Sequence, residues 1–251
     1  MSGAFSFRGV MERDRAGTRV VVFVDGQNLF KRTRALYGTG RLHPLLLARR
    51  LAGTRDLVGV RYYSGVHHPQ VEPAIRGATD RRHELMRSVG VDVFERTLRY
   101  RWEWGIDRTG LPDPARSRGQ TRTWTLAPFR RAREKGIDLA VGLDVMDLGL
   151  RDAMDVAVIV SSDTDLCEAA RATRATTCEA GRPVRTEAAV FDEGRRPILM
   201  RHYDYTHRLT RADHDACVDT FDYARPLDPS LREQFRERCR LVLPTGAGAP
   251  A

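Results

Sequence analysis

The sequence lacks any long hydrophobic run. A membrane-spanning helix needs about 20 predominantly apolar residues, and no apolar run in this 251-residue chain approaches that length. Residues 1–17, MSGAFSFRGVMERDRAG, also lack the apolar stretch of a secretory signal, because charged residues interrupt it. We therefore expect a soluble, cytoplasmic protein with no membrane partner.

Cysteine and lysine are both scarce. The four cysteines lie far apart without a C-x-x-C pair, which argues against a zinc site and a disulfide framework. Only Lys31 and Lys135 are lysines among 42 basic residues, so arginine carries the net charge of +9 and the pI of about 9.9. The arginine guanidinium forms bidentate hydrogen bonds with phosphate and stacks on bases, which favours a polyanionic partner. A GC-rich genome is an equally valid reason for the arginine content.

Strands and helices are predicted to alternate along most of the chain. Short apolar runs at 20–24, 58–63, 91–94 and 156–160 are typical of buried strands, and 181–191 reads as a turn and a fifth strand. Helix-length segments lie between them, at 27–37, 44–51, 79–89, 137–148 and 166–177. This pattern predicts a three-layer α/β/α fold around a mainly parallel sheet.

Two regions depart from this alternation. Residues 101–128 are rich in Arg, Trp, Pro and Gly, which predicts a long loop with one strand at 121–126. Beyond about residue 195 the alternation fades, leaving one predicted helix at 229–240 and a disordered tail. We expect an N-terminal arm over 1–17, an α/β domain over 18–192 and a C-terminal extension over 193–251.

Acidic residues follow two of the predicted strands. The first strand ends in Asp25, and Asn28 lies in the turn after it, while Asp163 and Asp165 come just past Val160. Ligands of open α/β sheets bind outside the carboxyl ends of the strands. If the two strands are neighbours, these carboxylates share one edge, where a divalent cation would neutralise their repulsion.

A third acidic segment is EKGIDLAVGLDVMDL, residues 134–148. Asp138 falls in the first turn of the predicted helix, where it can face a neighbouring strand end. At about 100° per residue, Asp144 lies roughly 120° around the helix from Asp138, and Asp147 points to the opposite side. We therefore place Asp138 in the site, Asp144 near it and Asp147 in solvent.

Each of these residues also has a simpler interpretation. Asp25 can cap the following helix, and Asp165 with Glu168 fits a capping box. Asp138 can be a favourable charge at a helix N-terminus, and Asn28 a turn residue. The functional interpretation gains weight because all of them fall at one predicted edge of the sheet.

Three segments together resemble the NYN domain, a family of the PIN-like nucleases. They are VVVFVDGQNLF (20–30), EKGIDLAVGLDVMDL (134–148) and DVAVIVSSDTDLCEAA (155–170), and the resemblance spans roughly residues 18–192. Asp25 and Asn28 match the D-G-x-N turn of the family, Asp138 and Asp144 its K-G-x-D helix, and Asp163 and Asp165 its S-G-D-S-D-F stretch. Ser162 and Leu166 depart from that last pattern without touching the carboxylates.

The resemblance implies a metal-dependent ribonuclease, expected to be an endonuclease. Asp25, Asp138 and Asp163 would hold Mg²⁺ or Mn²⁺, and Asp165 and Asn28 would complete the catalytic set. Such a metal polarises the scissile phosphate and lowers the pKa of a bound water. Because Mg²⁺ often takes only one or two carboxylates directly, some of these aspartates would orient water instead.

An RNA substrate would need positive surface next to this acidic site. The segment from 116 to 135 is strongly basic and leads directly into Asp138, and we expect Arg130, Arg131, Arg133 and Lys135 to contact RNA. Trp102, Trp104 and Trp124 lie nearby in the sequence, and exposed aromatic residues stack on bases. A solvated charged face and buried tryptophans are the alternatives. The C-terminal extension is a second candidate interface, for a homodimer or a protein partner.

Two other functions compete with the ribonuclease. One is a non-catalytic RNA-binding or adaptor protein that keeps the NYN fold, which a broken acidic set would favour. The other is a phosphohydrolase with an aspartate nucleophile, a chemistry that usually uses D-x-D at the first strand, where this chain has Gln27. The intact set of aspartates favours the ribonuclease over both.

Overall fold

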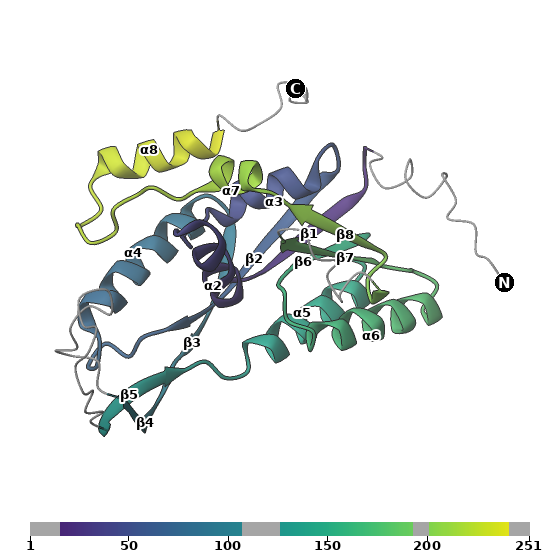
Figure 1. Cartoon of the computed structure of the whole chain (residues 1–251). Helices are drawn as coiled ribbons and strands as arrows, with labels where there is room; N and C mark the ends of the chain where they lie inside the picture. Colours follow the sequence, from purple (N-terminus) through teal and green to yellow (C-terminus); the bar gives the residue numbers. More distant parts are fainter. Residues whose placement is uncertain (1–15, 107–125, 193–200, 241–251) are drawn as a thin grey trace.

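A six-stranded parallel sheet forms the centre of the protein. In this computed structural model, residues 16–106, 126–192 and 201–240 are described. The strands lie in the order β3-β2-β1-β6-β7-β8, and every neighbouring pair is parallel (Figure 1). Their bounds are β1 Arg19–Asp25, β2 Asp56–Val66, β3 Val91–Thr97, β6 Val156–Val160, β7 Arg185–Phe191 and β8 Tyr205–Leu209.

Helices cover both faces of this sheet. On one face lie α2, α3 and α4, together with α7 and α8, and on the other lie α5 and α6 (Figure 1). Their bounds are α2 Gly26–Tyr37, α3 Pro44–Ala52, α4 Pro73–Ser88, α5 Ile137–Leu150, α6 Leu166–Glu179, α7 Arg211–Cys217 and α8 Pro229–Arg240. The predicted three-layer α/β/α architecture with a parallel sheet is thus confirmed.

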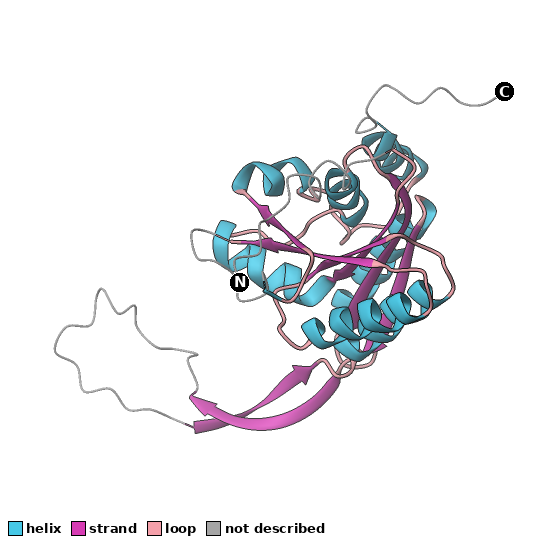
Figure 2. Cartoon of the chain, turned by 90° about the vertical axis from the view of Figure 1, so that its right-hand side faces the viewer, coloured by secondary structure: helices cyan, strands magenta, loops and turns pink. Residues whose placement is uncertain are grey.

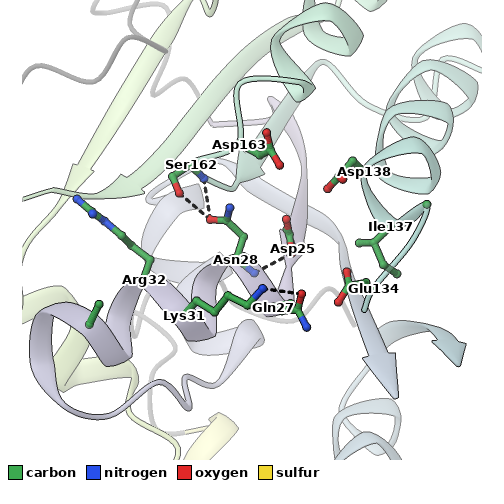
Figure 3. A pocket seen from close by; sticks show the side chains of 12 residues that line it. Asp25, Gln27, Asn28, Lys31, Arg32, Glu134, Ile137, Asp138, Ser162 and Asp163 are labelled. Atoms are coloured by element: carbon green, nitrogen blue, oxygen red, sulfur yellow. Dashed lines mark hydrogen bonds between the residues drawn. The ribbon is translucent and has the colours of Figure 1, made fainter. Parts of the chain in front are cut away.

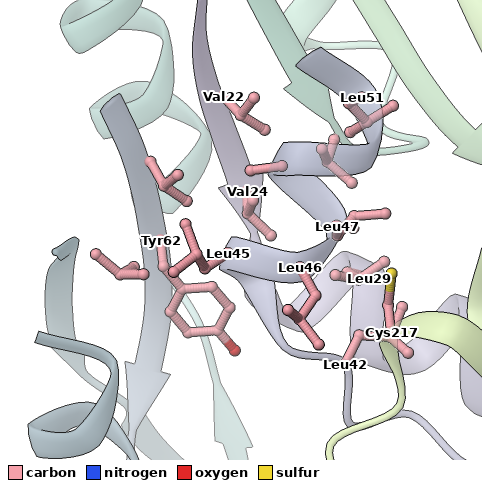
Figure 4. Close-up of a cluster of buried hydrophobic side chains, with 14 of the residues drawn as sticks. Val22, Val24, Leu29, Leu42, Leu45, Leu46, Leu47, Leu51, Tyr62 and Cys217 are labelled. Atoms are coloured by element: carbon pink, nitrogen blue, oxygen red, sulfur yellow. The ribbon is translucent and has the colours of Figure 1, made fainter. Parts of the chain in front are cut away.

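The central strand β1 explains why its sequence is apolar throughout. Successive side chains of a strand point to opposite faces, so Val20, Val22 and Val24 enter the core under α2 and α3, while Val21 and Phe23 enter the core under α5 and α6. Figure 4 shows the first of these cores, where leucines of α3 pack on Val22 and Val24. A strand buried on both faces has no polar position until it ends, and β1 ends at Asp25.

The chain beyond residue 200 contributes more to the fold than the sequence indicated. The predicted helix at 229–240 is α8, but strand β8 and helix α7 were not expected. Phe235 of α8 is fully buried and packs on the His43 ring, with a centroid separation of 4.6 Å. Arg232 pairs with Glu84 of α4 at 2.6 Å. This region therefore completes both the sheet and one of its cores.

The segment predicted as a long loop forms a β-hairpin instead. Strands β4 (Arg99–Ile106) and β5 (Leu126–Arg133) pair antiparallel with each other and not with the central sheet. Figure 2 shows this hairpin projecting from the body of the molecule. The loop prediction was wrong here because the hairpin exposes both of its faces. Aromatic residues therefore alternate with charged residues along β4, and the usual strand signal of alternating apolar and polar residues is missing. Residues 107–125 lie outside the described residues. They include Trp124 and all of the predicted strand at 121–126 except residue 126.

Candidate functional site

The candidate site begins where β1 passes into α2. Asp25 is the last residue of β1 and the N-cap of α2, and its Oδ1 accepts a hydrogen bond from the Asn28 N–H at 3.0 Å. Its Oδ2 accepts a second bond from the Ser161 hydroxyl at 3.3 Å. The residue is only 4% exposed. The helix-capping interpretation of Asp25 is therefore correct, and it places the carboxylate at the sheet edge.

Gly26 allows α2 to start at this point. A Cβ on Gly26 would lie 2.5 Å from the Tyr62 ring and 2.8 Å from the Tyr63 carbonyl oxygen, distances that real Cβ atoms do not adopt. The helix can thus approach β2 closely only without a side chain here. This contact explains the glycine of the Asp25-Gly26-Gln27-Asn28 turn in physical terms.

Asn28 connects this turn to the neighbouring strand. Strand β6 lies beside β1, so the segment after Val160 reaches the same edge. The Asn28 Oδ1 accepts bonds from the Ser162 N–H at 2.9 Å and from the Ser162 hydroxyl at 2.8 Å. With its oxygen occupied in this way, the amide nitrogen of Asn28 remains a donor for a ligand in the pocket.

Three of the predicted aspartates line one pocket of about 400 Å³. Asp25 comes from β1, Asp163 from the segment after β6, and Asp138 from the first turn of α5, and their carboxylates face a common space in Figure 3. Gly136 precedes α5 with a φ of 79°, a left-handed conformation that glycine adopts without strain and that turns the helix start toward the sheet. The neighbouring strands and the helix start meet as predicted.

The pocket is electrostatically unfavourable for its own carboxylates. Burial raises the pKa of Asp25, and the charges of Asp138 and Asp163 raise it further against the lowering effect of the Asn28 N–H. Burial and the charge of Asp163 raise the pKa of Asp138 as well. Both shifts mean that adding negative charge here costs free energy, which a bound cation would offset.

Glu134 is an acidic residue of the pocket that sequence reasoning missed. It follows β5 directly and lines the pocket beside Asp25 and Asp138. Its Oε2 is buried and has no hydrogen-bond partner among the described residues. Burial, with the charges of Asp25 and Asp138, raises the pKa of Glu134 to about 7. The residue stands in the 134–148 segment four positions before Asp138, but only the fold shows that it turns inward.

Cations on α2 also line the pocket and were missed as well. Lys31 donates to the Gln27 side-chain oxygen at 2.9 Å, and Arg32 donates to the Phe191 carbonyl oxygen at 2.9 Å. Gln27 and Lys31 are one helical turn apart, and so are Asn28 and Arg32, which was a readable signal. The pocket therefore holds two cations from α2 in addition to its acidic groups (Figure 3).

Other predicted residues lie outside this pocket in the described structure. Asp144 accepts bonds from Arg61 at 2.6 Å and from the Tyr63 hydroxyl at 2.5 Å, which join α5 to β2. Asp165 is exposed at the start of α6; its N–H donates to Asp163 Oδ1 at 3.1 Å, and its side chain makes no capping bond there. Lys135 is exposed and is not among the pocket-lining residues. Asp147 faces solvent, as predicted, and pairs with Arg151.

The donor chemistry of the pocket fits a hard divalent cation. Asp25, Asp138, Asp163 and Glu134 offer only oxygen donors, the ligands that Mg²⁺ and Mn²⁺ prefer. Among the described residues, no three acidic, histidine or cysteine side chains stand close enough together to enclose a metal ion. An ion that keeps most of its waters and takes one or two carboxylates would suit this spacing. The raised pKa values of Asp25 and Asp138 are consistent with such a site.

The predicted RNA-contacting arginines lie on the hairpin. Arg130, Arg131 and Arg133 belong to β5, and all three are exposed. Arg131 and Arg133 pair with Glu103 of β4 at 3.1 and 2.6 Å. Arg130 lies over the Trp102 ring, 5.2 Å from its centroid. These three arginines therefore lie on the hairpin and do not line the pocket.

The family of the protein follows from comparison with known families. The model of the NYN domain matches residues 19–181, which include β1, α5 and the segment after β6. The chain belongs to the NYN domain family. This family is part of the PIN-like nucleases, so the resemblance read from three short segments is confirmed. The match ends before β7 and β8, although both strands continue the central sheet of this NYN protein.

Other comparisons give less detail. A crystal structure of a protein of unknown function from Vibrio parahaemolyticus RIMD 2210633 is similar to this chain with a TM-score of 0.49 and 14% identity. That similarity covers 77% of this chain and 93% of the other. No curated protein matches the chain. Within the described residues, no helix is long and apolar enough to cross a membrane.

Proposed function

We propose that this NYN protein is a divalent-metal-dependent ribonuclease that cuts RNA internally. One observation carries the proposal: Asp25, Asp138 and Asp163 line a single pocket at the carboxyl ends of β1 and β6. Carboxylates do not gather at a buried sheet edge for stability, because burial and, to a smaller extent, their mutual repulsion raise the pKa of Asp25 and Asp138. The family is a nuclease family, which gives the pocket its chemical class.

The acidic residues of the pocket would hold the metal. Asp25, Asp138 and Asp163 are the proposed ligands, directly or through water, with Glu134 beside them. A bound Mg²⁺ or Mn²⁺ supplies Lewis-acid chemistry, which polarises a phosphate and makes water a stronger nucleophile. Asp165 stands next to Asp163 and would act only by orienting it, since its N–H donates to the Asp163 carboxylate.

The donors of α2 in the pocket would bind the phosphate. The amide nitrogen of Asn28 is a neutral donor held in place by Ser162. Lys31 and Arg32 add positive charge on the same helix. Together these groups would orient a phosphodiester against the acidic residues and offset its charge, which is the role of such donors in phosphoryl-transfer sites.

The test compares wild type with Asp163→Asn on labelled linear and circular RNA. With Mg²⁺ or Mn²⁺, wild type should cleave both, because only an endonuclease opens a circle. Asp163→Asn should reduce cleavage by about a hundredfold or more, because the amide keeps the size but loses the charge. RNA binding in a gel shift should be unchanged or stronger, since repulsion of the phosphate falls.

Asp147→Asn is the matched control, because Asp147 is exposed on α5 and pairs with Arg151. It should cleave like wild type, and chelator should stop every active variant. Equal cleavage by wild type and Asp163→Asn, or cleavage that survives chelator, would refute the proposed site. RNA binding by wild type without cleavage of any RNA would favour the adaptor function instead.

A further inference from the structure

The β4–β5 hairpin, here called the arm, leaves two tryptophans in solvent. Trp102 is 67% exposed and Trp104 is 72% exposed, the two highest values among the large apolar residues in the described part of the chain. The arm projects from the body and pairs with no strand of the central sheet (Figure 2). Such exposure of large aromatic rings is typical of a surface that binds a partner.

The two tryptophans share one face of the arm. Residues directly opposite in an antiparallel pair lie on the same face. Trp102 faces Arg130, and Trp104 faces Pro128. Along a strand, side chains two residues apart on one face are separated by about 6.8 Å, which is twice the stacking distance of nucleic-acid bases, about 3.4 Å. The two rings thus lie close enough along the arm for neighbouring nucleotides of one strand to contact both.

Contacts at its base hold the arm in place. The Tyr100 hydroxyl accepts a bond from the His68 N–H at 3.2 Å and bonds the His67 ring at 2.8 Å. The Leu98 N–H donates to the Val66 carbonyl oxygen at 2.9 Å, and the Leu98 side chain is buried. These contacts fix the start of the arm to the end of β2. A two-stranded hairpin is marginal alone, so this anchoring makes the arm a defined surface.

The arm leads directly to the pocket. Strand β5 ends at Arg133, the next residue is Glu134, and α5 begins at Ile137 with Asp138 in its first turn. Both Glu134 and Asp138 line the pocket. A ligand that lies along the arm is thus guided toward the acidic residues. The continuity of chain gives the arm a position next to the proposed cleavage site.

The charge of the arm identifies its partner. Its described strands carry five arginines and one glutamate, a net charge of +4. An apolar protein partner would not need these charges, and a second copy would bring another arm of charge +4 and a chain of net charge +9. Arg130 lies on the tryptophan face, and the other four arginines lie on the opposite face of the arm. Aromatic rings and arginines on one small element match a polyanion that exposes its bases. Arg130 stacked on Trp102 shows that a cation and a ring already share this face.

We infer that the arm binds unpaired nucleotides of RNA, with bases stacked on Trp102 and Trp104 and a phosphate beside Arg130 on the same face. The inference rests on the proposed function for the RNA and its cleavage. The stacking surface itself follows from the exposure, spacing and charge of the arm. Bases inside a duplex cannot stack on protein rings, so paired RNA would not use this face.

The experiment measures binding apart from cleavage. Wild type and Trp102→Ala/Trp104→Ala are titrated in chelator with a labelled uridine homo-oligomer and with a fully paired RNA duplex of equal length. The double variant should lose about tenfold or more in affinity for the oligomer, with little change for the duplex. Trp102→Phe/Trp104→Phe should retain most of the affinity, because an aromatic face remains.

A matched control and a second signal complete the design. Val58→Ala/Ile75→Ala removes two exposed apolar side chains from other parts of the surface and should bind the oligomer like wild type. All three tryptophans of the chain lie between residues 102 and 124, so quenching of intrinsic fluorescence by the oligomer reports on that segment. Equal melting temperatures of all variants would confirm that none is unfolded.

The outcomes separate this inference from the proposed function. Unchanged oligomer affinity in the double alanine variant would overturn the inference, and if wild type still cleaves RNA, the proposed function stands. If that variant instead changes from dimer to monomer with unchanged affinity, the arm is an interface between copies, which also overturns the inference. Loss of affinity without any cleavage by wild type would support the arm and refute the nuclease.

Discussion

At the scale of single residues, Asp25 shows that a structural and a functional role can coincide. Its carboxylate caps α2 through the Asn28 N–H, and the same group lines the pocket. A cap exposed to water would not be disturbed by its neighbours, but burial and nearby carboxylates raise the pKa of Asp25. The cap therefore fixes the position of a carboxylate whose environment favours a cation.

Glu134 gives the first prediction about stability. Its pKa is about 7 in the folded chain, above the ordinary value of 4.5. The folded state thus binds this proton more tightly than the unfolded state, so the stabilisation is complete below pH 4.5 and is lost as the pH rises through about 7. In chelator, the melting temperature of Glu134→Gln should fall less than that of wild type between about pH 5 and pH 8.

The control for this prediction is Glu179→Gln, which changes an exposed carboxylate at the end of α6. Its melting temperature should follow that of wild type at every pH. Parallel curves for wild type and Glu134→Gln would contradict the raised pKa. A larger fall in the variant than in wild type would reverse the sign of the effect.

The sequence located part of the site at this scale. Asp25, Asn28, Asp138 and Asp163 could be predicted because strand ends and helix starts are readable, and the structure places all four at one pocket. Asp144 was misplaced because helical geometry gives a direction around the helix but not which neighbours, here Arg61 and Tyr63, receive the side chain. Glu134 became visible only when β5 and α5 were packed beside β1, whereas Lys31 could have been found from its spacing of one helical turn from Gln27.

At the scale of elements, Gly26 sets the distance between α2 and β2. Gly26→Ala should lower the free energy of unfolding by about 1–3 kcal/mol, because the added Cβ would lie 2.5 Å from the Tyr62 ring. The variant should also cleave RNA more slowly than wild type, because relief of the clash would move the neighbouring Asp25. Urea unfolding and an RNA cleavage assay measure the two effects.

Gly59→Ala is the matched control for Gly26→Ala. Its Cβ would meet only Val21, at 3.5 Å, which is ordinary van der Waals contact. Both variants add one methyl group next to the β1–β2 pair, so the difference between them measures the close approach. Equal unfolding midpoints for the two variants would show that the turn tolerates a side chain.

Elements were predicted well where burial decided them and poorly where it did not. The apolar strands of the central sheet were readable because both of their faces lie in the core. The hairpin escaped because its residues alternate between arginine and aromatic side chains without a buried face. Strand β8 escaped because it is an edge strand of mixed character, YTHRL, whose pairing with β7 is decided by the sheet and not by its own sequence.

At the scale of the whole molecule, a chain of positive net charge contains an acidic pocket. The chain has a net charge of +9, yet four carboxylates line its proposed catalytic site. A polyanionic substrate is attracted by the overall charge and repelled by the pocket. Binding therefore requires positive charge, while the proposed cleavage requires acidic residues at the same region of the protein. In the proposed binding mode, the arginines of the arm would hold the substrate next to but outside the acidic residues.

The salt dependence of RNA binding tests this division of charge. Each phosphate neutralised on a single strand contributes about 0.7 to the slope of log affinity against log salt. Replacing Arg130, Arg131 and Arg133 by alanine should therefore lower the slope by up to about 2. Glu103→Gln should act in the opposite direction, because it releases Arg131 and Arg133 from their ion pairs on the arm.

A control must separate the effect of the lower net charge on RNA binding from the effect of losing arginines at the arm. A matched triple variant replaces three exposed arginines away from the arm by alanine, with the same change in net charge: Arg151, Arg171 and Arg225. If the arm holds the RNA, this variant should keep nearly the wild-type slope, while the arm variant loses slope and affinity in anisotropy titrations across a salt series. Equal losses in the two variants would mean that RNA senses only the overall charge and that the arginines of the arm are a solvated face.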